Sequence, residues 1–193
     1  MKRRYGFVSN SSSTSFTFVF KGDKVEDLSN TIMKYKSFFD LSFFDEGWGD
    51  NDNTTYTCNA QEVGEAIEKY VKSEPKYEFD KVSVVSIDNH IANLVKEINS
   101  NYKYIGEEKE KQKNDPSAWS CIDLWEEHNI DLKNEVNSMR SAKDKGLHSV
   151  LVIGFGDNDG QISGGSLGHC MDYEGRYMSI DEDDFMVYTE QNR

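Results

Sequence analysis

The strongest strand signal in the chain is His148-Ser149-Val150-Leu151-Val152-Ile153-Gly154-Phe155. Its centre, residues 150–153, is a continuous apolar run bounded by turn-forming residues, which is the pattern of a β-strand. Glycines and polar residues follow it at 156–160 and end the strand. A second strand is predicted at residues 16–21, where Phe16-Thr17-Phe18-Val19-Phe20 precedes the turn Gly22-Asp23. These two segments predict a protein built on a β-sheet.

Helical spacing of apolar residues appears between the predicted strands. It predicts helices over residues 25–36 with Asp23 as the N-cap, over 59–72 with a capping box of Asn59 and Glu62, and over 90–99. A helical turn around 119–125 and a helix resuming from Leu132 toward 145 are also expected, whereas 107–115 reads as a solvated loop or helix end. Further strands are predicted at 54–58, 77–80, 82–87, 170–173, 176–180 and 185–188. The chain is therefore expected to be a single α+β domain over 16–193, preceded by a lead-in at 1–15. Its mixed or antiparallel sheet is covered by three to four helices, and its C-terminal quarter is rich in strands.

Composition narrows the function further. The 193 residues carry a formal net charge of −13, which opposes direct binding to nucleic acid and leaves a basic protein partner, cation binding or simple solubility as its explanation. No apolar run approaches the roughly 20 residues of a membrane span. Three widely spaced cysteines (Cys58, Cys121 and Cys170) without a signal peptide predict free thiols and a cytoplasmic location. No cofactor is expected.

The N-terminus carries a distinctive string. Residues 6–16, Gly-Phe-Val-Ser-Asn-Ser-Ser-Ser-Thr-Ser-Phe, follow a basic tip at Lys2-Arg3-Arg4. This string resembles the G-F-V-S-N-S-S-S-S-S-F opening of uncharacterised proteins from phage genomes and some bacteria, with Thr14 in place of one serine. The resemblance covers about the first 16 residues and implies an accessory gene product made inside an infected or lysogenic bacterium. It implies no biochemical activity.

Residues 38–53 combine five aromatic and five acidic residues with no basic residue. Aromatic side chains supply buried area in a protein interface, and acids complement a basic partner. The segment is therefore the predicted partner-binding surface, and the alternative is a core-facing aromatic set beside a solvated acidic loop. The residues assigned to the surface are Phe43, Phe44, Asp45, Glu46, Trp48, Asp50 and Asp52.

Residues for catalysis are also present. Cys58 precedes a predicted helix, whose dipole would lower the thiol pKa, and a site of Cys58, His169 and Asp172 is one hypothesis for a cysteine-dependent hydrolase. His169, Cys170 and Asp172 form a second hypothesis, a metal-assisted site, because Cys170 and Asp172 would share one face of a strand. Ordinary buried thiols are the simpler interpretation, and no defined metal site is predicted.

Glycines and acids of the C-terminal region resemble ligand-binding loops only in part. The G-x-G-x-x-G frame started at Gly154 has Asp159 where the third glycine belongs, and Asp157 starts no calcium-binding frame. Hairpin turns are the predicted explanation for these glycines, and a solvated turn is predicted for residues 181–184.

Together these observations favour a non-enzymatic, acidic interaction protein of phage type. It would bind a host protein, including one whose basic surface normally holds nucleic acid. The alternatives are a cysteine- or metal-dependent hydrolase that uses the C-terminal His, Cys and Asp residues, and a structural or assembly component of a virion.

Overall fold

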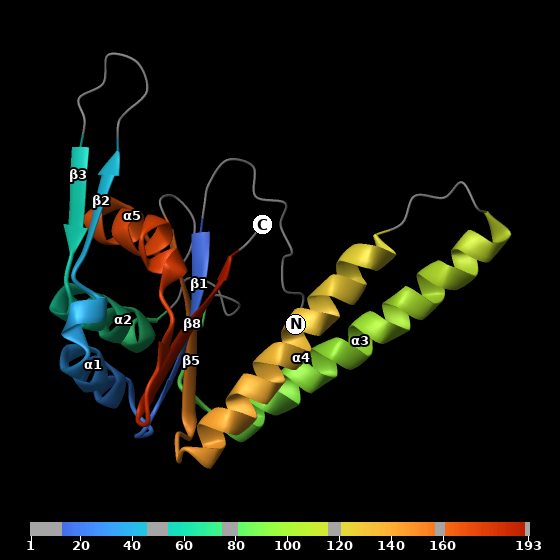
Figure 1. The fold of residues 1–193 in the computed structure, drawn as a ribbon, viewed down its shortest axis with the longest axis horizontal. Coiled ribbons are helices and arrows are strands. Elements are labelled where there is room, and N and C mark those ends of the chain that lie inside the picture. The colour runs from blue at the N-terminus through green and yellow to red at the C-terminus, as the bar shows by residue number, and fades with distance from the viewer. Residues whose placement is uncertain (1–12, 46–53, 75–80, 116–120, 157–160, 192–193) are drawn as a thin grey trace.

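A central antiparallel sheet organises the chain in the computed structural model, which describes residues 13–45, 54–74, 81–115, 121–156 and 161–191 (Figure 1). Strand β1 (Ser13–Phe20) lies in the middle, between β5 (Ser149–Gly156) and β8 (Phe185–Gln191). Short strands β4 (Val85–Ser86) and β7 (Ile180–Asp181) flank these three, and β6 (Ile162–Ser163) pairs in parallel with the end of β5. The predicted α+β fold is confirmed, and its strongest predicted strand pairs directly with the N-terminal strand.

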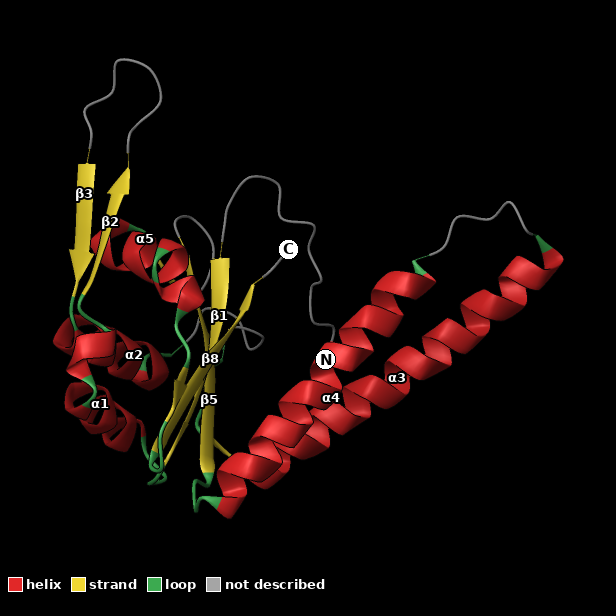
Figure 2. Cartoon of the chain, viewed as in Figure 1, coloured by secondary structure: helices red, strands yellow, loops and turns green. Residues whose placement is uncertain are grey.

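One face of the sheet carries the larger core. Phe16, Phe18 and Phe20 of β1 are fully buried there, because alternate residues of a strand point to the same side. Three helices cover this face, as Figure 2 shows: α1 (Val25–Lys34), α2 (Ala60–Lys72) and α5 (Gly165–Tyr173). The short helices η1 (Lys36–Phe38) and η3 (Gly175–Tyr177) connect elements on this side. A separate two-stranded sheet, β2 (Leu41–Asp45) with β3 (Thr54–Cys58), packs against α5.

The other face meets a helical hairpin, which we call the arm. It consists of α3 (Ile87–Asn114) and α4 (Ile122–Asp144), which pack along each other and extend away from the sheet (Figure 1). At its base, Ile87, Met139 and Ala142 pack against Val19 and Val150 of the sheet. The 28 residues of α3 span about 42 Å at 1.5 Å per residue, so most of the arm lies beyond this contact.

Polar pairs occupy the interior of the arm among its apolar contacts. His90 Nε2 lies 2.7 Å from Glu135 Oε1, and the Asn101 side-chain amide donates to Asn129 Oδ1 at 3.0 Å. The apolar contacts between them come from Leu94, Ile98, Leu132 and Val136. These polar residues break the apolar spacing that identifies helices in sequence. The prediction that α3 ends near residue 99 and that 107–115 is a loop or helix end was therefore too short, and α4 is continuous from Ile122.

Several local predictions are settled by the backbone. The capping box of α2 is confirmed, since Asn59 Oδ1 accepts from the Glu62 amide and Glu62 Oε2 accepts from the Asn59 amide, both at 3.1 Å. Asp23 does not cap α1; instead Asp27 Oδ2 accepts from the amides of residues 23 and 24. The strand predicted at 82–87 is reduced to β4, and β1 begins at Ser13, inside the predicted lead-in. The strand predicted at 77–80 and residues 157–160 of the predicted turn lie outside the described residues.

The most informative difference is α5. A strand was predicted at 170–173, and no helix was expected after the glycines, but residues 165–173 form a helix. Glycine is required here for close packing, because a Cβ on Gly168 would lie 2.5 Å from the Gly156 carbonyl oxygen of β5. Gly165, at φ 63°, starts the helix in the left-handed region. The glycines thus bring α5 onto the sheet rather than forming hairpin turns.

Candidate functional site

Four of the residues singled out in the sequence, Phe43, Cys58, His169 and Cys170, meet where the β2–β3 hairpin packs on α5. Phe43 of β2 stacks on Tyr173 of α5 with ring centroids 4.4 Å apart, and Tyr56 of β3 stacks on His169 at 4.1 Å. Phe43 and Tyr56 are also nearly parallel to each other, with an interplanar angle of 12°. The guanidinium carbon of Arg176 lies 5.0 Å from the centroid of the Tyr173 ring. Four stacked rings therefore fix the hairpin to the helix.

Two thiols lie under this stack. Cys58 and Cys170 are both buried and free, and they lie close enough to interact through their side chains. Burial raises the pKa of Cys58 to about 12, and the neighbouring Cys170 adds to the effect. Burial also raises the pKa of Cys170. The prediction that the helix dipole lowers the Cys58 pKa is wrong, because desolvation of the thiolate outweighs the dipole of α2. Neither thiol is poised as a nucleophile at neutral pH.

His169 and Asp172 point to different partners. His169 lies against the ring of Tyr56, whereas Asp172 is fully buried beside β1 and accepts a hydrogen bond from Thr14 Oγ1 at 2.8 Å. The backbone carbonyl of Asp172 accepts from Arg176 Nε at 2.7 Å. Because residues 169–172 are helical, Cys170 and Asp172 do not share a strand face as the metal hypothesis required. The carboxylate of Asp172 ties α5 to the central sheet.

The acidic turn near the C-terminus is engaged in ion pairs. Asp184 accepts hydrogen bonds from Lys34 and Tyr35. Both bonds lower the pKa of Asp184, and the bond from Lys34 has the larger effect. Asp181 pairs with Lys145. Across the described part of the chain, no cluster of three or more His, Cys, Asp or Glu side chains has the arrangement of a metal site. The predicted solvated turn is exposed at residues 181–183, and its last residue, Asp184, links it to the end of α1.

The predicted partner-binding surface divides between the two faces of β2. Phe43 faces inward into the ring stack, while the next residue, Phe44, is 54% exposed on the outer face of the hairpin. Asp45 ends the strand and is half-buried, and Asp40 before it is exposed. Phe43 therefore packs in the interior of the hairpin, and among the described residues assigned to this surface Phe44 is the exposed aromatic side chain. The other four residues assigned to this surface, Glu46, Trp48, Asp50 and Asp52, lie outside the described residues.

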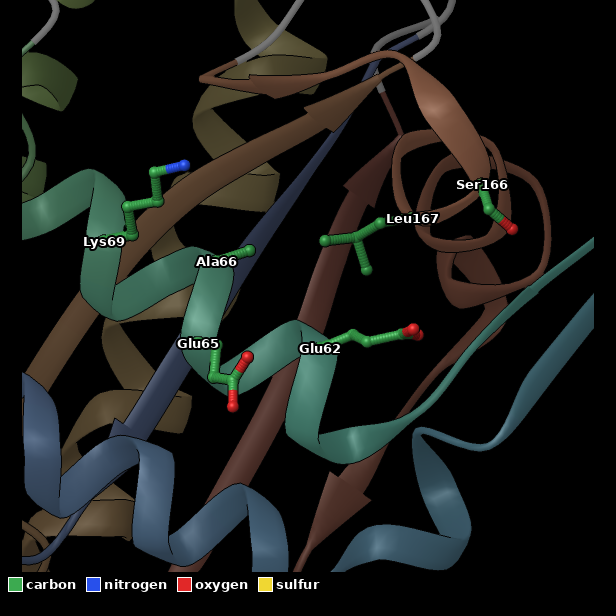
Figure 3. Close-up of a pocket in the computed structure, with 6 residues that line it drawn as sticks. All are labelled: Glu62, Glu65, Ala66, Lys69, Ser166 and Leu167. Atoms are coloured by element: carbon green, nitrogen blue, oxygen red, sulfur yellow. The ribbon is translucent and has the colours of Figure 1, made fainter.

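A shallow depression of about 340 Å³ lies between α2 and α5 (Figure 3). Ala66 and Leu167 point toward one another across it, and Glu62 points to the side of α5. Two of its polar groups are already used: Glu62 caps α2, and the Ser166 hydroxyl bridges the backbone amide and carbonyl of Thr57. The six residues that line it are Glu62, Glu65, Ala66, Lys69, Ser166 and Leu167. Two of its four polar side chains therefore stabilise the fold.

Sequence reasoning missed the partners that complete the ring stack. Tyr56, Tyr173 and Arg176 gave no separate signal, because the ring stack joins residues from two segments more than 100 positions apart. The single usable clue was the alternation of Phe43 and Phe44 with polar neighbours, which indicates a strand with one inward and one outward aromatic.

The chain is thus an α+β sheet protein with a projecting helical arm and a β-hairpin that is held on α5. Comparison of the chain with protein-family models, with curated proteins and with solved structures gave no match. Within the described residues, no helix combines the length and apolar character needed to cross a membrane.

Proposed function

We propose that this protein acts by binding a basic partner protein rather than by catalysis, with the outer face of the β2–β3 hairpin as the contact surface. The observation that carries the proposal is the exposure of Phe44, 54%, directly beside the inward-facing Phe43. An aromatic side chain on a rigid support is a typical anchor of an interface, because it buries a large area while losing little conformational entropy.

The support beneath Phe44 is well defined. Rings of Phe43 and Tyr56 stack on α5, and Cys58 at the end of β3 is buried in the core. The inner face of the hairpin therefore packs against α5, and the outer face faces away from the core.

Charge indicates the kind of partner. Residues 38–53 hold five acids and no basic residue, whereas α3 balances five acidic with five basic residues. The segment that contains the hairpin therefore carries part of the chain's acidic excess, whereas α3 carries none of it. Such a segment attracts a basic surface and accelerates its association.

The resemblance of the N-terminal string implies that the protein is made inside a bacterium, where its partner would also be found. An accessory product made inside a bacterium would meet host proteins, and a basic surface that normally holds nucleic acid carries the charge that complements this hairpin. The partner we propose is therefore a basic host protein of the bacterium. The buried thiols with raised pKa values support binding rather than cysteine chemistry.

Affinity capture from bacterial lysate tests the proposal. The tagged wild-type protein, Phe44→Ala and Tyr177→Ala are compared at low and high ionic strength. Tyr177 is the matched control, because its side chain is 76% exposed in η3 and lies outside the hairpin. A basic protein retained by the wild type and by Tyr177→Ala, but lost with Phe44→Ala and at high ionic strength, is the expected result. Equal retention by Phe44→Ala would contradict the proposal.

A further inference from the structure

The two edges of the β2–β3 hairpin differ in their hydrogen bonding. The Thr57 amide and carbonyl of β3 both bond to the Ser166 hydroxyl of α5, so these groups point away from β2. In an antiparallel pair, a residue whose backbone groups point outward faces a partner whose groups also point outward. Thr57 pairs with Ser42, and Thr55 pairs with Phe44. The backbone groups of Ser42 and Phe44 therefore point away from β3, at the free edge of β2.

This edge of β2 is open in the part of the chain that the structure describes. Ser166 closes the β3 edge at Thr57, but no described residue hydrogen-bonds the backbone of Ser42 or Phe44 outside the hairpin. Both residues are exposed. Two N–H and two C=O groups are thus presented in register beside an exposed aromatic ring, which is the arrangement that accepts an additional strand.

We infer that the edge of β2 binds an extended, basic segment of the partner by strand addition. This inference rests on the proposed function and specifies its binding mode. The occupant follows from charge: Asp40 and Asp45 lie at the two ends of the strand, and β2 itself contains no basic residue. Side chains of an added strand lie about 5 Å from those of β2, so an apolar residue opposite Phe44 covers its ring on the outer face. The neighbouring lysine or arginine points to the other face, beside Asp45, and Asp40 adds negative charge at the other end of the strand.

Charge also disfavours a second copy of the chain as the occupant. Two β2 strands paired edge to edge would bring four acidic residues together at the new interface, counting Asp40 and Asp45 from each copy. Like charges placed across neighbouring strands are destabilising.

The probe for this inference is a short synthetic peptide of alternating lysine and valine, which matches the two-residue period of a strand. Its affinity is measured by fluorescence anisotropy, and backbone amide exchange is followed by NMR. Binding is expected to slow exchange at the Ser42 and Phe44 amides. The same peptide N-methylated on alternate backbone amides cannot pair with an edge, and it should bind at least about tenfold more weakly. A glutamate–valine peptide should not bind.

Two proline variants separate edge pairing from general charge attraction. Ser42→Pro removes an outward amide from the β2 edge, and Thr55→Pro removes an outward amide from β3, the opposite strand. Neither amide takes part in the β2–β3 ladder, so both variants are expected to fold, which circular dichroism checks. Only Ser42→Pro should weaken the lysine–valine peptide, by about tenfold.

Several results would overturn strand addition. These are equal binding of the N-methylated peptide to the wild type, equal binding by Ser42→Pro, or no binding of the lysine–valine peptide. Self-association of the wild type that Ser42→Pro abolishes would make the occupant a second copy, which also overturns it. Because the N-methylated peptide is tested on the wild-type protein, the outcome does not depend on either variant folding. If capture still depends on Phe44, the proposed function stands and only its binding mode is wrong.

Discussion

Neighbouring phenylalanines in β2 are expected to have opposite roles, and a pair of alanine variants tests this. Phe43 contacts two rings, Tyr173 at 4.4 Å and Tyr56 at 6.2 Å, and is partly buried, whereas Phe44 is 54% exposed. Replacing a fully buried phenylalanine by alanine costs about 3–5 kcal/mol, and partial burial reduces this to about 2–3 kcal/mol for Phe43→Ala. Phe44→Ala should cost less than about 0.5 kcal/mol.

Urea titration followed by circular dichroism measures both costs. With an m-value of about 2 kcal/mol/M, Phe43→Ala should lower the midpoint by about 1 M, while the midpoint of Phe44→Ala should stay close to the wild type. The stacking contribution is isolated by a double-mutant cycle of Phe43→Ala with Tyr173→Ala, where a coupling of about 0.5–1.5 kcal/mol is expected. Equal midpoints for the two single variants would refute the inward and outward assignment.

Two further predictions concern buried polar groups. Because burial raises the Cys58 pKa to about 12 from an ordinary value of 9.0, the folded protein holds this proton after the unfolded chain has lost it. The stabilising contribution of the buried thiol is complete below pH 9 and is lost as pH rises toward 12, at about 1.4 kcal/mol per pH unit. The urea midpoint of the wild type should therefore fall over this pH range. The midpoint of Cys58→Ala should fall less, because this variant lacks the thiol. In the arm, Asn101→Leu removes the hydrogen bond to the buried Oδ1 of Asn129, whose side-chain nitrogen already lacks a partner among the described residues. This single change should lower the free energy of unfolding by about 1–3 kcal/mol. The double change to leucine at both positions should be neutral or stabilising in a thermal melt, and a double variant less stable than the single one would contradict this account.

The sheet and its first helices were predictable because their signals are local. The run at 150–153 and the alternation at 16–20 each define a strand, and the capping pair of Asn59 and Glu62 defines the start of α2. The lengths of α3 and α4 were not predictable from spacing, since His90, Asn101 and Asn129 occupy buried positions where the apolar pattern requires hydrophobic residues. Their burial is made possible by pairing across the arm, which is a tertiary property.

The candidate site was predictable only in part. The segment containing Phe43 and Phe44 was predicted to be a binding surface, but which ring points outward depends on the packing of α5, and residues 170–173 of α5 were predicted as a strand. Its sequence, with two glycines and few strong helix formers, has little helical propensity, and its helical state comes from the close approach of Gly168 to β5. Burial likewise decided the Cys58 pKa against the effect of its position before a helix.

The length of the arm is a feature of this protein that can change without a change in the sheet. Beyond its base, the described part of the arm is held together by pairs between α3 and α4 alone, so its length is independent of the sheet. Removing seven residues from each helix, which preserves the face that each presents to the other, would shorten its reach by about 10 Å without uncovering any strand. The arm can therefore differ in length between related sequences while the sheet and the helices that cover it stay the same.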